Sequence, residues 1–72
     1  MSQKPALQEA IEGEVAKFDL LIPEHRARAL LSAARLVASV DDVTIRWEYT
    51  KWLAALVGVE IFTVKRVVEQ VA

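Results

Sequence analysis

The side chains that could do acid–base, nucleophilic or metal chemistry are few in this chain. His25 is the only histidine among 72 residues and the chain has no cysteine, so a zinc site built from Cys and His ligands is excluded. Glu12, Glu14 and Asp19 lie close together in sequence, but a solvated helix face explains these acids better than general acid–base catalysis does. Only two glycines are present, too few for a phosphate-binding glycine loop. We therefore expect no enzymatic activity, no metal and no cofactor.

Basic side chains form a second set with possible chemistry. Two interpretations compete: a composite phosphate-binding face, or an ordinary solvated surface with interspersed acids, which we slightly favour. The formal net charge of −1 and the pI of about 5.7 weigh against non-specific binding to nucleic acid or to a membrane surface. The residues in question are Arg26, Arg28, Arg35, Arg46, Lys51, Lys65 and Arg66.

Length and composition indicate one small domain. A chain of 72 residues buries only about 60% of the surface that its unfolded form exposes. Its apolar content of 54% is high, so we expect some apolar surface to lie in a subunit or partner interface. No apolar run is long enough to span a bilayer, and the first residues lack the hydrophobic core of a signal peptide. We expect a soluble, cytoplasmic protein that forms a homodimer.

Apolar periodicity and helix boundary signals predict an all-α fold. The expected helices cover residues 5–18, 23–40, 43–57 and 59–71, and they would form a compact bundle of about four helices. Pro5 and Pro23 suit first helical positions, and Gly58 suits the left-handed position that follows a helix.

Residues 43–49 allow two interpretations. Val43, Ile45, Trp47 and Tyr49 alternate with polar residues, as in a half-buried strand. A helix with an apolar stripe fits equally well. Because we find no partner strand for the backbone groups of a lone strand, we favour the helix.

The segment LAALVGVEIFTVKRVVEQ, residues 53–70, has the spacing of a helix-turn-helix. Ala54 supplies a small residue where two helices cross, and Gly58 opens the turn four residues later. Val59 follows as an apolar plug, and Val64 and Val67 are expected to face inward. These features, with "GV", "TV" and "RVV" in this register, resemble the helix-turn-helix of lac-repressor-family regulators.

This resemblance implies a small DNA-binding transcriptional regulator. The second helix of the motif would enter the major groove of double-stranded DNA, and a homodimer would set the half-site spacing. Thr63, Lys65 and Arg66 would then lie near the DNA, with Thr63 or Arg66 touching phosphate. Lys51 is an additional candidate DNA contact.

A protein-interaction module is the alternative interpretation. Ile61 and Phe62 open the second helix of the motif, where apolar side chains make no hydrogen bonds to bases. They would instead form an interface with a protein partner, or lie covered by the N-terminal helix. In the first case the chain would be a small inhibitor, adaptor or assembly subunit that uses the helix-turn-helix frame only for packing.

Overall fold

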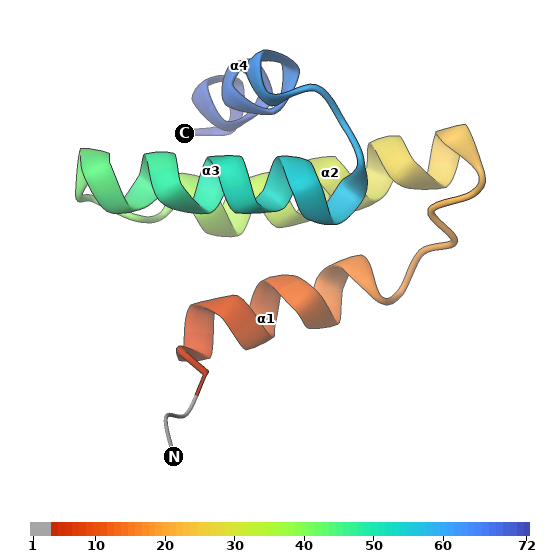
Figure 1. Ribbon diagram of the computed structural model, residues 1–72, viewed down its shortest axis with the longest axis horizontal. Coiled ribbons are helices and arrows are strands. Elements are labelled where there is room, and N and C mark those ends of the chain that lie inside the picture. Colours follow the sequence, from red (N-terminus) through yellow and green to blue (C-terminus); the bar gives the residue numbers. More distant parts are fainter. Residues whose placement is uncertain (1–3) are drawn as a thin grey trace.

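The structure is a computed structural model that describes residues 4–72, and its regular elements are all helices (Figure 1). These are α1 (Ala6–Val15), α2 (Pro23–Ala38), α3 (Val43–Val57) and α4 (Ile61–Val71). The prediction of an all-α bundle of about four helices is confirmed. Residues 43–49 lie in α3, so the strand alternative for this segment is wrong.

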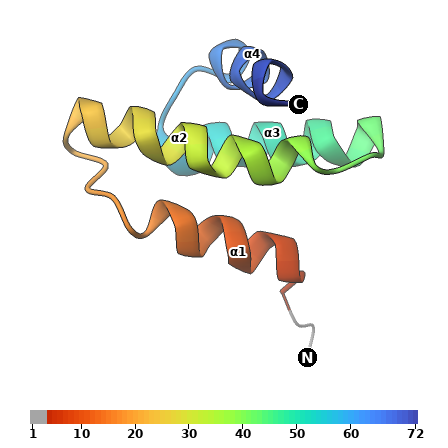
Figure 2. The same ribbon diagram turned by 180° about the vertical axis from the view of Figure 1, so that it is seen from behind.

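Helix α2 is the centre of the bundle, because it packs against each of the other three helices. Figures 1 and 2 show α2 and α3 side by side in a middle layer, with α1 on one face and α4 on the opposite face. Helix α4 contacts both helices of that layer. The outer side of α4 therefore faces away from α1.

Each helix contributes one fully buried aliphatic side chain to a single core. These are Ile11, Val37, Leu53 and Val64, each 0% exposed. Burying such a side chain stabilises the fold by about 1.5–3 kcal/mol. Ala33 and Ala34 are also fully buried in α2, and their small size lets neighbouring helices approach closely. The rest of the cluster comprises Val15, Leu30, Ala54, Val57 and Val68.

Two helices end earlier than expected. Helix α1 ends at Val15 rather than at residue 18, and α2 ends at Ala38 rather than at residue 40. After each end the chain forms a tight turn, in which backbone amides donate to carbonyls three residues back. The Phe18 amide lies 3.1 Å from the Val15 oxygen, and the Val40 amide lies 3.1 Å from the Val37 oxygen. Apolar periodicity does not distinguish such tight turns from a further helical turn.

Gly58 ends α3 in the left-handed conformation, with φ 71° and ψ 37°. The amides of Gly58 and Val59 donate to the Ala54 carbonyl at 2.9 and 3.1 Å, and the 3.1 Å bond is the long hydrogen bond of a Schellman motif. Glu60 caps the next helix, so α4 begins at Ile61 and not at residue 59. Inside α4 the buried residues are Val64 and Val68, whereas Val67 is only half-buried. Val67 packs against the core from its edge, so it faces inward as expected, but less deeply than Val64.

Candidate functional site

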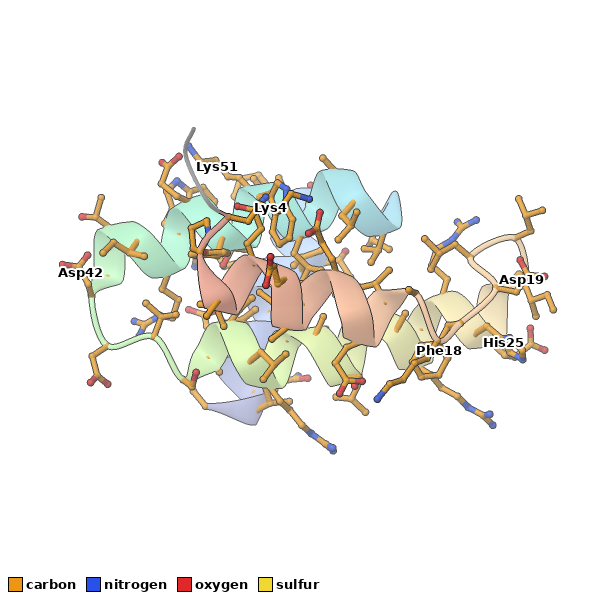
Figure 3. The ribbon with its side chains drawn as sticks, turned by 90° about the horizontal axis from the view of Figure 1, so that it is seen from below. Lys4, Phe18, Asp19, His25, Asp42 and Lys51 are labelled. Carbon is orange, nitrogen blue, oxygen red and sulfur yellow. The ribbon has the colours of Figure 1, made fainter. Side chains whose placement is uncertain are left out.

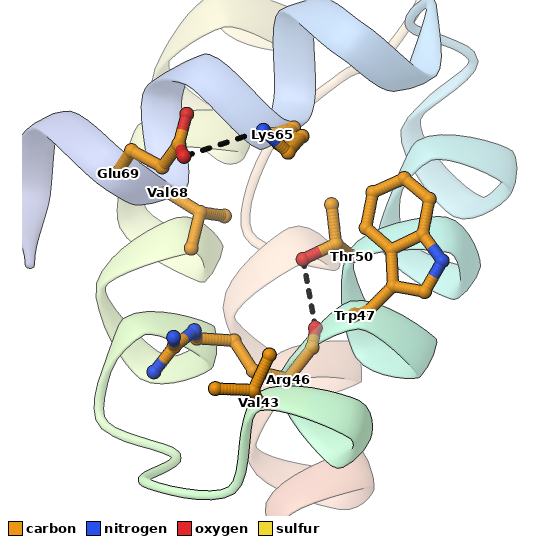
Figure 4. Close-up of a pocket in the computed structure, with 7 residues that line it drawn as sticks. All are labelled: Val43, Arg46, Trp47, Thr50, Lys65, Val68 and Glu69. Atoms are coloured by element: carbon orange, nitrogen blue, oxygen red, sulfur yellow. Dashed lines mark hydrogen bonds and ion pairs between the residues drawn. The ribbon is translucent and has the colours of Figure 1, made fainter.

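A groove runs between the N-terminal half of α3 and helix α4 (Figure 4). It encloses about 150 Å³. We call it the α3–α4 groove. Its lining residues are Val43, Arg46, Trp47, Thr50, Lys65, Val68 and Glu69.

The interior of the α3–α4 groove is mainly apolar. Val68 and Thr50 are 3% and 2% exposed and form its floor. The Thr50 hydroxyl donates to the Arg46 carbonyl at 2.8 Å, so this buried polar group is already satisfied. On the α3 side, Val43 is 70% exposed and Trp47 is half-buried. The sequence did not indicate Val43 as a site residue, although its spacing of four residues from Trp47 places the two on one helix face.

The rim of the groove carries charged side chains that are already held in place. The Lys65 ammonium lies 3.3 Å from a carboxylate oxygen of Glu69. Both side chains are about half exposed, and such a pair contributes only about 0.3–0.5 kcal/mol. Arg46 donates from Nη1 to the Val40 carbonyl at 2.8 Å. The rim is therefore ordered, and Lys65 can exchange its partner at low cost.

Phe62 extends the apolar surface beyond the groove. Its side chain is 63% exposed, and it lies three residues before Lys65 on α4, so the two share one side of the helix. Because α1 lies on the opposite face of the middle layer (Figure 1), it does not cover Phe62, and that alternative is wrong. Ile61 differs from Phe62, since it is half-buried and packs against the core.

The predicted DNA contacts lie on two helices, Lys51 on α3 and the other three on α4. The Thr63 amide donates to the carboxylate of the capping residue Glu60 at 3.0 Å, and Lys51 pairs with Glu48 at 2.7 Å. Lys65 lines the groove, and Arg66 is exposed beside it in sequence. The Glu60 carboxylate also occupies the N-terminus of α4, which is where a helix would otherwise bind phosphate.

Two further arginines hold loops in place. Arg26 donates from Nε to the Leu20 carbonyl at 3.0 Å, which ties the start of α2 to the preceding loop. Arg46 ties α3 to the α2–α3 loop in the same way. Both side chains are part-buried. The seven basic residues that we considered as a composite phosphate-binding face thus include two with structural roles.

The acids considered for catalysis lie on a different side of the bundle from the groove. Glu14 accepts hydrogen bonds from the Ser32 hydroxyl at 3.2 Å and pairs with Lys17 at 3.1 Å. The bond and charge of Lys17, with help from Ser32, lower the pKa of Glu14. His25 and Asp19 lie at one end of the molecule and Asp42 at the other (Figure 3). Within residues 4–72, no three His, Cys, Asp or Glu side chains gather to hold a metal ion.

A family model described as the DnaB-helicase binding domain of primase matches residues 10–61, which is well over half of the chain. The chain belongs to this family. The match to the helicase-binding domain runs from α1 to the first residue of α4, and it includes the α3 side of the groove. No curated protein and no solved structure matches the chain.

The family assignment corrects the resemblance to lac-repressor-family regulators, which is wrong. A small residue, a glycine and inward valines satisfy the packing of any two helices joined by a tight turn, and Ala54, Gly58 and Val64 do this here. DNA binding and transcription regulation gain no support, and neither does a DNA-binding helix-turn-helix. The finding favours the alternative, a protein-interaction module.

No helix in the described part of the chain is long and apolar enough to cross a membrane.

Proposed function

We propose that this domain binds DnaB helicase and acts by binding, not by catalysis. The observation that carries this proposal is the match of residues 10–61 to the DnaB-helicase binding domain of primase. Exposed apolar side chains support it, since Val43 and Phe62 are 70% and 63% exposed and suit a protein interface.

Electrostatics also favour a protein partner over nucleic acid. The chain has a formal net charge of −1, and the Glu60 carboxylate accepts from the Thr63 amide at the N-terminus of α4. Charge-driven DNA binding needs a basic surface and an accessible site for phosphate. Both features weaken the case for DNA as the partner.

The test measures two affinities under the same conditions. Isothermal titration calorimetry follows binding of the 72-residue chain to purified DnaB helicase. Fluorescence anisotropy follows its binding to a labelled random duplex at low and moderate salt. We expect saturable binding to the helicase and no salt-sensitive binding to the duplex. An absence of helicase binding would overturn the proposal, and a steep salt-dependent affinity for the duplex would restore DNA as the partner.

Homodimer formation and a cytoplasmic location stay predictions. Light scattering during size-exclusion chromatography measures the mass of the free domain, for which a monomer has 8.0 kDa. A mass twice that value would support the homodimer.

A further inference from the structure

We infer that the α3–α4 groove is the docking site of this domain, and that its occupant is an amphipathic helix of the helicase with acidic side chains beside its apolar stripe. This inference rests on the proposed function. It adds which surface makes the contact and what chemistry the partner presents.

The size and lining of the groove suit an apolar side chain. A dry cavity of about 150 Å³ holds a ring the size of benzene, and the α3–α4 groove encloses about 150 Å³. A leucine or phenylalanine of the partner therefore fits over the floor formed by Val68 and Thr50. An amphipathic helix inserts such anchors at spacings of three or four residues.

Exposed apolar side chains continue on both sides of this hollow. Val43 stands at the start of the α3 wall and is 70% exposed. Phe62 lies one turn before Lys65 on α4 and is 63% exposed. Partner residues before and after the central anchor would cover these two side chains. The surface is thus elongated, as a docked helix requires, and it spans two helices of the domain.

Charge is unevenly distributed around the groove. Arg46 and Lys65 line it, and Glu69 is the acid among its lining residues. Lys51, one turn after Trp47 on α3, adds no net charge because it pairs with Glu48 at 2.7 Å. A lining with more basic than acidic side chains, on a domain of net charge −1, favours a partner with carboxylates at matching positions and steers its approach.

Arg46 is positioned before the partner arrives, whereas Lys65 is held only weakly. Arg46 uses Nη1 to hold the Val40 carbonyl, and a guanidinium has five N–H donors, so others remain for a carboxylate. Lys65 is held by Glu69 at 3.3 Å in a weak, half-exposed pair. Side chains that are ordered beforehand lose less conformational entropy on binding.

The decisive experiment compares Val43→Asp with Ile45→Asp in calorimetric titrations against DnaB helicase. Both changes put a carboxylate into the first turn of α3, so their effects on the helix dipole are alike. Val43 lines the groove. Ile45 is 50% exposed and lies one turn before Tyr49, on the side of α3 where Tyr49 and Gln8 of α1 line a separate hollow. We expect Val43→Asp to weaken binding by more than about tenfold, because it buries an unpaired carboxylate against the apolar stripe of the partner, and Ile45→Asp to bind like the unmodified domain.

A second pair tests the acidic character of the partner and does not depend on Val43. Lys65→Glu reverses a charge on the rim, and Lys17→Glu reverses one in the α1–α2 loop, where the side chain is 66% exposed. We expect Lys65→Glu to lower the affinity and to flatten its salt dependence, and Lys17→Glu to change neither. Tighter binding by Lys65→Glu would overturn the acidic occupant.

The outcomes separate the two proposals. If the unmodified domain does not bind the helicase, the proposed function fails. If it binds, and Val43→Asp and Lys65→Glu bind the helicase as tightly as the unmodified domain does, the function stands and the groove is not the docking site. Circular dichroism of each variant checks that helicity is retained. If Val43→Asp unfolds the domain, the Lys65 and Lys17 pair decides alone.

Discussion

The carboxylate of Glu60 is bound to Thr63 twice, with Oε2 3.0 Å from the Thr63 amide and 3.4 Å from its hydroxyl. This arrangement is an N-terminal cap made by the residue that precedes α4. Its negative charge also lies at the positive end of the helix. One residue thereby starts α4 and places a carboxylate where the helix N-terminus would otherwise bind a phosphate.

Replacing Glu60 by alanine should therefore loosen α4. We expect a loss of about 1 kcal/mol of stability, typical of a lost N-cap. For a domain of this size such a loss lowers the midpoint of thermal unfolding by roughly 4–8 °C. Thermal unfolding followed by circular dichroism measures it. Glu69→Ala is the control, because it removes a half-exposed ion pair and should change stability by less than about 0.5 kcal/mol. Equal effects of the two changes would mean that the Glu60 cap has no special role.

Gly58→Ala should destabilise the fold through the backbone alone. An added Cβ at Gly58 would meet nothing within 4 Å, so no clash arises. The residue has φ 71°, however, and a left-handed conformation costs an L-residue about 1–2 kcal/mol. Denaturant unfolding should report a loss of that size.

Gly13 provides the opposite case. It lies within α1 in an exposed position, and an added Cβ there also meets nothing within 4 Å. Because glycine is poorer than alanine in a helix by roughly 1 kcal/mol, Gly13→Ala should stabilise the domain. If Gly58→Ala and Gly13→Ala change the free energy of unfolding in the same direction, backbone conformation does not explain their effects.

Much of the fold was predictable because its determinants are local. The left-handed glycine at position 58 and the proline at position 23 have single-residue preferences that apply in any tertiary context. The ends of α1 and α2 were not predictable in the same way. Phe18 and Val40 continue an apolar pattern, but tight turns after Val15 and Val37 carry them out of the helix.

The candidate site was harder to predict from the sequence than the helices, because a groove depends on how two helices pack. Lys65 and Phe62 were recognised as surface residues of interest, but neither Val43 nor Trp47 was predicted to line a groove. Their role depends on the position of α4 over the N-terminal half of α3. The spacing that suggested a DNA-binding motif reflects packing of Ala54 and Val64, which are buried, and contains no information on the ligand.

Leu53→Ala should be among the most damaging single changes. Leu53 is 0% exposed, and such a truncation costs about 2–5 kcal/mol through lost burial and the cavity left behind. Ile45→Ala removes a similar aliphatic group from a position that is 50% exposed, and it should cost less than about 0.5 kcal/mol. Urea unfolding of the two variants measures the difference. A small effect at Leu53 would contradict its placement in the core.

Acidification should destabilise the C-terminal end of α1 through Glu14, and to a smaller extent its contact with α2. Lys17, first by its hydrogen bond and then by its charge, lowers the pKa of Glu14 in the folded state, and the Ser32 hydroxyl adds to this. A carboxyl whose folded pKa lies below its unfolded pKa binds fewer protons when folded. Its contribution is therefore complete above the unfolded pKa, about 4.3 for glutamate, and is lost as the pH falls through the folded value.

Glu14→Gln tests this pH dependence because it removes the titrating group and keeps its shape. We expect the variant to lose less stability than the unmodified domain when urea unfolding is repeated from neutral pH to below about pH 4.3. Lys17→Gln should reduce the acid sensitivity in the same way, since it removes the main cause of the lowered pKa. In the double variant the two effects should not add, because each removes the same ion pair. Unchanged acid sensitivity in both single variants would show that other carboxylates govern the loss of stability at low pH.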